Sequence, residues 1–188
     1  MIYETIISTV DVQGQVHVTP FGIRKEGDFV IISPYKPSAT LDNVLSTKCA
    51  VMNLTDDVRV FASAIVRENQ DYLLTPAIKV NGYRLANTLA HQELVLANVK
   101  EDELRPELHM QVVYEATHQA FSGFNRAQAA VIELAVLVSR LHILPKDKVL
   151  TEKHYLQIAI DKTAGAQELQ AWRWLEQKIN TFYINQQE

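Results

Sequence analysis

SPYKPSATLDNVLSTKCAVMNLTDD, residues 33 to 57, is the stretch that decides the fold. Three apolar residues in it recur at the i, i+3, i+4 spacing of one helix face: Leu41, Val44 and Leu45. Ser38 follows a proline and precedes this face, so it is the expected N-cap of a short amphipathic helix. The helix should end near Lys48, since a cation is favoured at the negative end of the helix dipole.

The beginning of this helix has the features of an anion-binding site. The amides of a first helical turn point outward without partners, with the positive end of the dipole behind them. Lys36 adds a positive charge there, and Ser38 and Thr40 add two hydroxyls. The alternative is an ordinary capped surface helix, and this stretch alone does not decide between the two.

The strand expected at residues 50 to 54 ends in polar residues. Asn53 needs partners for both ends of its amide, because an unpaired buried polar group costs about 1 to 3 kcal/mol. Neighbouring backbone or the hydroxyls of a ligand would provide them. Asp56 or Asp57 is expected to cap a second helix. Because capping accounts for both aspartates, and a divalent metal needs more converging oxygens, we predict no metal site.

Two strands precede this stretch, at residues 2 to 12 and 16 to 24, and the turn at Gln13-Gly14 predicts that they form a hairpin. Pro20 cannot donate to a strand ladder, and Gly22 has no side chain. The second strand should therefore bulge or lie at an edge where something approaches its backbone closely. A flat ligand fits that description, and so does an edge strand that its proline protects.

The remaining chain divides into a β-rich part and a helical part. Apolar residues predict a buried strand at 29 to 32 and further strands at 92 to 99 and 108 to 117. From Ser122 onward the patterns are helical. We therefore predict one domain at residues 1–120 and a helical C-terminal subdomain at 121–188.

The helical part should contain three helices. The first follows Asn125, an expected N-cap, and its long apolar stripe should be buried against the barrel or in a subunit interface. Thr151 is expected to cap the second helix, which should end at Gly165. The third should turn five residues inward: Leu169, Trp172, Leu175, Ile179 and Phe182.

Composition limits the class of protein. The 188 residues carry 18 basic and 22 acidic side chains, a formal net charge of −4, in an even mixture that gives no reason to expect a nucleic-acid partner. No apolar run approaches the ~20 residues that span a bilayer, so no membrane association is expected. The single cysteine, Cys49, lies in an apolar run and should pack in the core of a reduced, cytoplasmic protein.

The common catalytic motifs are absent from the sequence. There is no HExxH, CxxC, GxGxxG, GxxxxGK[ST] or GxSxG pattern. The six histidines are scattered along the chain, at spacings more typical of packed or exposed residues than of metal ligands. Any catalysis is therefore expected to depend on a bound cofactor.

HVTPFGIR at residues 17–24, followed by PSATLDNVLSTKCAVMNLTDD at 37–57, resembles the FMN-binding split barrel of the flavin-reductase and pyridoxamine-phosphate-oxidase-like group. YETIISTVD, GFNRAQAAVIELAVLVSRLHIL and DKTAG extend the similarity to one family within it. That family is catalogued as a domain of unknown function, and its members are split barrels with a helical C-terminal part. The expected fold is thus mainly β plus α, an FMN-binding split β-barrel with a C-terminal helical segment.

The resemblance implies an FMN cofactor near the boundary of an obligate homodimer. It implies that the FMN phosphate lies at Lys36, Ser38, Thr40 and Asn43, the ribityl chain at Asn53 and Thr55, and the ring along Thr19 to Gly22. Asn125 and Arg126 are a further candidate pair, although capping also explains Asn125. The complete set of cofactor-binding candidates is Thr19, Pro20, Phe21, Gly22, Tyr35, Lys36, Pro37, Ser38, Thr40, Asn43, Asn53 and Thr55.

Three functions remain open from the sequence. The first is a flavin-dependent oxidoreductase that moves hydride from a nicotinamide donor to a small-molecule substrate through FMN. The second is a noncatalytic FMN carrier or sensor whose helical part engages a partner. The third is a dimeric structural module without a ligand. The sequence identifies no catalytic side chain for the first of them.

Overall fold

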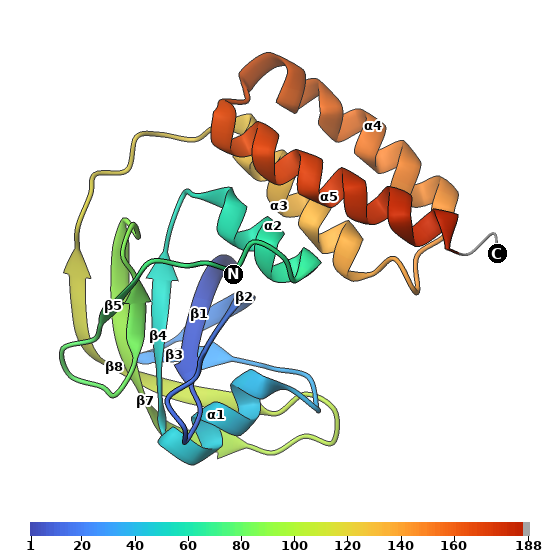
Figure 1. Cartoon of the computed structure of the whole chain (residues 1–188). Coiled ribbons are helices and arrows are strands. Elements are labelled where there is room, and N and C mark those ends of the chain that lie inside the picture. Colours follow the sequence, from blue (N-terminus) through green and yellow to red (C-terminus); the bar gives the residue numbers. More distant parts are fainter. Residues whose placement is uncertain (186–188) are drawn as a thin grey trace. The chain divides into compact units, whose positions relative to one another are not determined.

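The computed structural model describes residues 1–185, which form two compact units (Figure 1). One unit contains residues 1–55 and 72–121, and the other contains residues 56–71 and the chain from Ser122 onward. Helix α2 (Val58–Val66) thus joins the helical unit, whereas the division predicted from the sequence places it in the first domain. The reason is packing, because Val58, Ala62 and Val66 are buried in the same cluster as the C-terminal helices.

The first unit is a closed, six-stranded antiparallel barrel with the strand order β1-β2-β3-β8-β7-β4. This confirms the predicted barrel followed by a helical segment. Residues 67 to 81, for which no strand is predicted, contain β5, which pairs with β6 in a small separate sheet. The barrel strands are β1 (Ile2–Val10), β2 (Val16–Glu26), β3 (Phe29–Ile32), β4 (Cys49–Leu54), β7 (Ala90–Lys100) and β8 (Glu107–Thr117), and the small sheet contains β5 (Leu74–Pro76) and β6 (Tyr83–Leu85).

The predicted β1–β2 hairpin is present and leaves one edge of β2 open. The two strands pair without a register shift from Ile2 opposite Arg24 to Val10 opposite Val16, so β2 has no bulge. On its other side β2 pairs with β3 only between Arg24 and Glu26. No other strand in residues 1–185 pairs with residues 16–23, so this proline-containing segment lies at an edge, which fits both the edge-strand and the flat-ligand alternatives.

The barrel core is filled from its strands and from helix α1 (Ala39–Thr47). Leu41 and Val44 of the predicted helix face are buried, whereas Leu45 is 38 % exposed at the surface. Lys48 ends the helix in the left-handed conformation, with its N–H bonded to the carbonyl of Val44. The buried core residues are Ile7, Ile23, Val30, Ile32, Leu41, Val44, Ala50, Met52, Leu94, Leu108 and Met110.

The helical unit packs α2 with α3 (Arg126–Ser139), α4 (Lys146–Thr163) and α5 (Ala166–Ile184). The apolar stripe of α3 is buried against the other helices of its own unit, which neither alternative of the prediction included. Of the five residues expected inward on α5, Leu169 is 37 % exposed and Phe182 is partly buried, while the other three are buried.

Helix α4 begins immediately after Pro145, so Thr151 is an interior residue and the predicted cap is wrong. Proline suits a helix start, because its fixed backbone angle matches the helix and the first turn needs no N–H donor from it. In the sequence, Pro145 was therefore the residue that indicated where α4 begins.

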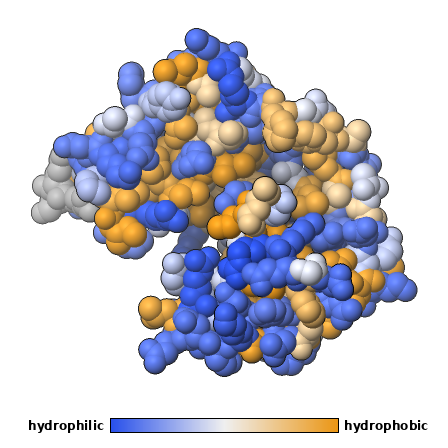
Figure 2. Space-filling model, turned by 180° about the vertical axis from the view of Figure 1, so that it is seen from behind, coloured by the Kyte–Doolittle hydropathy of each residue, from blue (hydrophilic) through white to orange (hydrophobic). Residues whose placement is uncertain are grey.

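The surface mixes hydrophilic and hydrophobic side chains, as the face in Figure 2 shows. No helix in the described part of the chain is both long and apolar enough to cross a membrane. Cys49 is a free, buried cysteine, as expected from its apolar surroundings.

Candidate functional site

The first turn of α1 is capped as the sequence predicts. The Ser38 hydroxyl oxygen accepts a hydrogen bond from the amide of Leu41 at 3.2 Å, and the Ser38 carbonyl accepts one from the amide of Asp42 at 3.1 Å. The amides of Ala39 and Thr40 have no helix carbonyl one turn before them. The hydroxyl hydrogen of Ser38 is also free for donation, because the oxygen acts as the acceptor in the cap. This turn therefore offers an anion several N–H and O–H donors.

Lys36 lies beside this turn, but its side chain is directed to the loop between β7 and β8. Its Nζ donates to the carbonyl of Asp102 at 2.9 Å and pairs with Glu101 at 3.4 Å. Its backbone amide donates to the carbonyl of Leu104 at 2.9 Å. Lys36 and three acidic residues line an open hollow at this loop: Glu101, Asp102 and Glu103. Because the ion pair is exposed, it is worth less than about 1 kcal/mol, and the amine can leave it at little cost.

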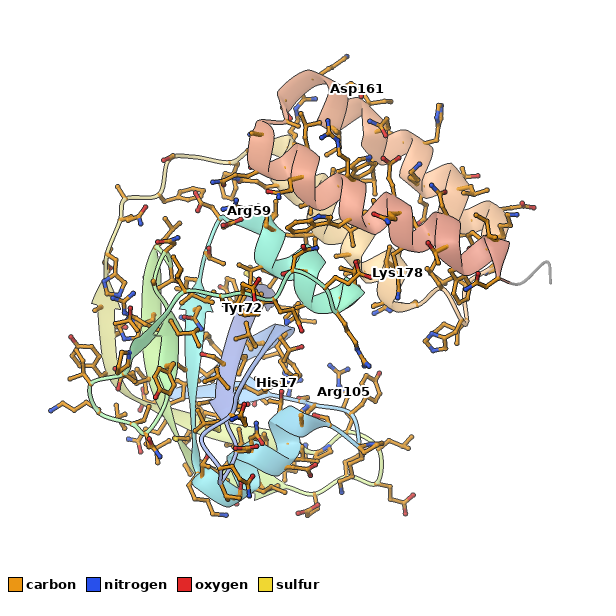
Figure 3. The ribbon with its side chains drawn as sticks, viewed as in Figure 1. His17, Arg59, Tyr72, Arg105, Asp161 and Lys178 are labelled. Atoms are coloured by element: carbon orange, nitrogen blue, oxygen red, sulfur yellow. The ribbon has the colours of Figure 1, made fainter. Side chains whose placement is uncertain are left out.

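Arg105, from the same loop, brings a second positive charge to the segment before α1 (Figure 3). Its Nε donates to the carbonyl of Ser33 at 2.9 Å, and its guanidinium lies 4.9 Å from the centre of the Tyr35 ring. Sequence reasoning missed this residue, because no local pattern connects Arg105 with the segment before α1. The contacts with Ser33 and Tyr35 depend on strand pairing between distant parts of the chain.

Thr40 and Asn43 lie on the buried side of α1. Thr40 is 1 % exposed and Asn43 is 8 % exposed. The Asn43 side-chain amide donates to the hydroxyl of Thr9 on β1 at 3.0 Å. Both residues thus lie near Ser38 on the same helix. The side-chain amide of Asn43, however, is bonded to β1 and attaches α1 to the barrel. Tyr35 and Pro37 lie in the exposed loop before the helix.

The predicted ring-binding segment, Thr19 to Gly22, lies on the open-edged part of β2. Side chains alternate along a strand, so Pro20 and Gly22 share one face while Thr19 and Phe21 share the other. The hydroxyl of Thr5 donates to the carbonyl of Phe21 at 3.1 Å. A Cβ at Gly22 would lie only 2.8 Å from Cγ2 of Ile2. The neighbouring strand therefore approaches Gly22 closely, and the binding of a flat ligand there stays a prediction.

Gly22→Ala is expected to destabilise the protein by less than about 1 kcal/mol, since the added methyl meets Cγ2 of Ile2, a side chain that is 65 % exposed and can shift. Ile2→Ala removes the clashing Cγ2, so the double variant should recover most of this loss. A double-mutant cycle of urea unfolding measures the coupling. Additive losses in the two single variants would contradict the steric explanation.

Asn53 is fully buried, and the protein itself satisfies both ends of its amide. Its Nδ2 donates to the hydroxyl of Ser8 at 3.1 Å and to the carbonyl of Ile6 at 3.3 Å. Its Oδ1 accepts from the amide of Leu85 at 2.7 Å. The structure thus favours the first alternative for this residue, in which it bonds to neighbouring groups of the chain. Thr55 follows β4 and is half-buried.

The motifs of the helical unit are used for capping. Asp57 caps α2 by accepting from the amide of Arg59 at 3.1 Å, and its carboxylate also pairs with the Arg59 guanidinium at 2.6 Å (Figure 3). Asn125 caps α3 by accepting from the amide of Ala127 at 2.8 Å. Gln128, three residues after Asn125, donates to Glu168 at the start of α5. Capping therefore accounts for Asp57 and Asn125.

A group of titratable residues that the sequence did not single out lies on the outer face of the barrel strands. His91 and Glu93 are opposite Asn53 and Val51 in the β4–β7 ladder, on the face away from the barrel core. His91 contacts both Glu93 and His118 through its ring nitrogens. Residues 91 and 93 have the i, i+2 spacing of a shared strand face, but the strand predicted from the sequence began at residue 92 and so left His91 out.

Two family models together cover most of the chain. The N-terminal domain model of the proteins of unknown function DUF447 matches residues 3–119, and the model for the remainder of these proteins matches residues 125–177. The chain belongs to the DUF447 family. A search of curated protein sequences finds no match.

Solved structures share this DUF447 fold. The FMN-bound DUF447 protein MM1853 from Methanosarcina mazei covers 94 % of each chain, with a TM-score of 0.79 at 20 % identity. The 2-nitrobenzoate 2-nitroreductase NbaA of Pseudomonas fluorescens covers 61 % of this chain and 64 % of its own, with a TM-score of 0.53 at 15 % identity. A putative flavin reductase from Haemophilus somnus covers 63 % of this chain and 81 % of its own, with a TM-score of 0.53 at 12 % identity. The DUF447 chain thus has the fold of a group that includes flavin proteins.

Proposed function

We propose that this DUF447 protein binds FMN noncovalently, with the phosphate at the beginning of α1. The observation that carries the proposal is the capped first turn of α1, where the Ser38 oxygen accepts from the amide of Leu41 and its hydroxyl hydrogen is left for a ligand. Arg105 adds a positive charge near this turn. The FMN-bound structure of another DUF447 protein supports the choice of this ligand over other phosphates.

The residues present fit the parts of FMN in different ways. The amides of Ala39 and Thr40, with Ser38, suit the phosphate. The open edge of β2 between residues 16 and 23 offers backbone donors and acceptors to the polar edge of a ring. Asn53 fits the ribityl chain less well, because its hydrogen bonds are already made within the protein. We therefore expect the ribityl chain to be bound by groups other than the side-chain amide of Asn53.

Replacing the residues at the helix start should weaken FMN binding. For Lys36→Ala with Ser38→Ala we expect the Kd for FMN to rise about tenfold or more, because hydrogen bonds to a charged group contribute about 1.5 to 3 kcal/mol each. Ser46→Ala is the matched control, since Ser46 lies at the other end of α1 and bonds only to its own helix carbonyls. Fluorescence titration of FMN measures the Kd. An unchanged Kd in the double variant, at a temperature where it is fully folded, would contradict this site.

We propose that the bound flavin serves an oxidoreductase. When bound, FMN supplies hydride-transfer chemistry between a nicotinamide donor and a small acceptor, while the chain binds and orients it. Steady-state oxidation of NADH and NADPH with candidate acceptors tests this step. Turnover above that of an equal concentration of free FMN is the expected result. FMN binding without such turnover would indicate a carrier or sensor instead.

We also propose that the protein is a homodimer in which the FMN sites lie near the subunit boundary. Exposed apolar residues on the β1–β2 hairpin support this, since Ile2 at the start of β1 is 65 % exposed and Val12 in the turn after it is 70 % exposed. Sedimentation equilibrium should give twice the mass of one chain. A monomer that binds FMN with unchanged affinity on dilution would overturn the shared site.

A further inference from the structure

Glu93 lies at the buried end of a chain of three titratable side chains. It is fully buried, and its carboxylate accepts hydrogen bonds from the backbone amides of Ile78, Lys79 and Val80 at 2.7, 2.6 and 3.1 Å. Its Oε1 also lies 3.3 Å from Nε2 of His91. Burial alone would raise the pKa of Glu93, but the three amides and His91 together hold it below the ordinary value. The carboxylate is therefore ionised.

His91 continues this chain to His118. The Nδ1 of His91 lies 2.9 Å from the Nε2 of His118, and the two ring planes are 16° apart. His91 is 2 % exposed, whereas His118 is at the surface just after β8. The order from the interior to the surface is thus a carboxylate, a buried imidazole and an exposed imidazole.

The contacts determine where each proton is. An ionised carboxylate can only accept, so Nε2 of His91 carries a proton and donates it to Glu93. In the neutral pair Nδ1 of His91 is then an acceptor, and Nε2 of His118 must be the donor to it. The remaining ring nitrogen, Nδ1 of His118, carries the lone pair at the surface end of the chain.

The surroundings keep His118 neutral. Burial lowers the pKa of His118, and the positive charge of Arg84 on β6 and the neighbouring His91 lower it further. Tyr114 on β8 also faces the group, with its ring 5.7 Å from that of His91. The charged and titratable groups described around His118 are Arg84, His91, Glu93 and Tyr114. Of these four, Glu93 is the anion, so it is the group that favours a positive charge on His118.

We propose that Glu93, His91 and His118 form a proton relay whose exposed end, Nδ1 of His118, takes a proton from an O–H or N–H group of a small molecule. His118 is the proton acceptor, and His91 and Glu93 are positioning residues. The arrangement gives the protein an acid–base group that is independent of FMN. It lies on the same barrel face as Asn53, which is directly opposite His91 in the β4–β7 ladder.

The proton transfer balances without any other reactant. The O–H or N–H bond of the small molecule breaks and its electron pair stays on that molecule, while an N–H bond forms at Nδ1 of His118. The Nε2 proton of His118 then bonds more strongly to His91, whose own Nε2 proton is shared with Glu93. The positive charge is offset by the carboxylate, and the proton leaves by the reverse path.

The relay is tested in flavin-free, full-length protein labelled with 15N-histidine, so that it does not depend on the proposed FMN site. Side-chain 15N signals are followed through a pH titration. We expect His118 to titrate below the ordinary histidine pKa of about 6.5, and the His91 15N signals to change over the same pH range as those of His118. In Arg84→Gln the His118 midpoint should rise, because a repelling charge is removed. An ordinary His118 midpoint with no response from His91 would overturn the relay.

Hydrolysis of ethyl dichloroacetate tests the exposed nitrogen, since imidazole acts on an ester with this poor leaving group as a general base that removes an O–H proton from the attacking water. We expect His118→Gln to lose most of the imidazole-dependent rate, and His91→Gln to lose part of it. His154→Gln is the matched control and should react like the unmodified protein. Equal rates for His118→Gln and His154→Gln would overturn the assignment of His118 as a proton acceptor, whatever the outcome of FMN binding.

Discussion

Glu93→Ala is expected to destabilise the protein by about 3 to 5 kcal/mol, a large part of the stability of a typical domain. The substitution removes the acceptor of three backbone amides and of His91, and each buried donor left without a partner costs about 1 to 3 kcal/mol. The segment at residues 78–80 should lose its attachment to β7. Urea unfolding followed by tyrosine and tryptophan fluorescence measures the loss.

Glu115→Ala is the control, because Glu115 is an exposed strand residue whose carboxylate accepts a hydrogen bond from Gln92. It should cost less than about 1 kcal/mol. The pKa of Glu93 is lowered by folding, so its contribution is fully present above the ordinary glutamate pKa of about 4.3 and is lost as the pH falls further. The difference between wild type and Glu93→Ala should therefore shrink below about pH 4. A pH-independent difference would contradict an ionised Glu93.

Leu134→Ala should have a comparable effect in the helical unit, about 3 kcal/mol. Leu134 is fully buried in the centre of α3, within the cluster formed by all four helices of this unit. Truncation removes its transfer free energy and leaves a cavity, which together cost about 2 to 5 kcal/mol. Unfolding followed by far-UV circular dichroism reports on these helices.

Leu150→Ala provides the comparison for Leu134→Ala, since Leu150 lies on α4 and is 41 % exposed. Its truncation should change the free energy of unfolding by less than about 1 kcal/mol. Equal losses for the two leucines would mean that α3 is not the centre of the helical core.

Local signals in the sequence were sufficient for much of the fold. The Ser38 cap, the face of α1 and the β1–β2 hairpin all follow from residues close together in the chain, and the structure has each of them. The need of Asn53 for partners at both ends of its amide is also evident from the sequence. The sequence does not reveal that Leu85 is one of these partners, because Leu85 lies on β6, 32 positions after Asn53.

Features that depend on long-range register could not be predicted from one sequence. His91 and His118 belong to different parts of the chain, and only the pairing of β7 with β8 brings their rings together. Arg105 reaches the segment before α1 in the same way. The packing partner of α3 was missed because an apolar helix face does not specify what covers it.

The sequence singled out Gly22 as a position where something approaches the backbone, and the structure shows one such neighbour. A missing side chain indicates only that something approaches the backbone, and in this barrel it is Ile2 of the adjacent strand. The helix start at Ser38 keeps its role in the proposed site, because its donors face outward from α1.

The central claim, that this DUF447 protein binds FMN, is tested most directly by titrating FMN into the purified protein and recording the visible absorption spectrum and the thermal midpoint. The account predicts a shifted flavin spectrum that saturates at one FMN per chain, and a midpoint that rises with FMN concentration because the ligand binds only the folded state. A free-flavin spectrum at every ratio, with an unchanged midpoint, would contradict it.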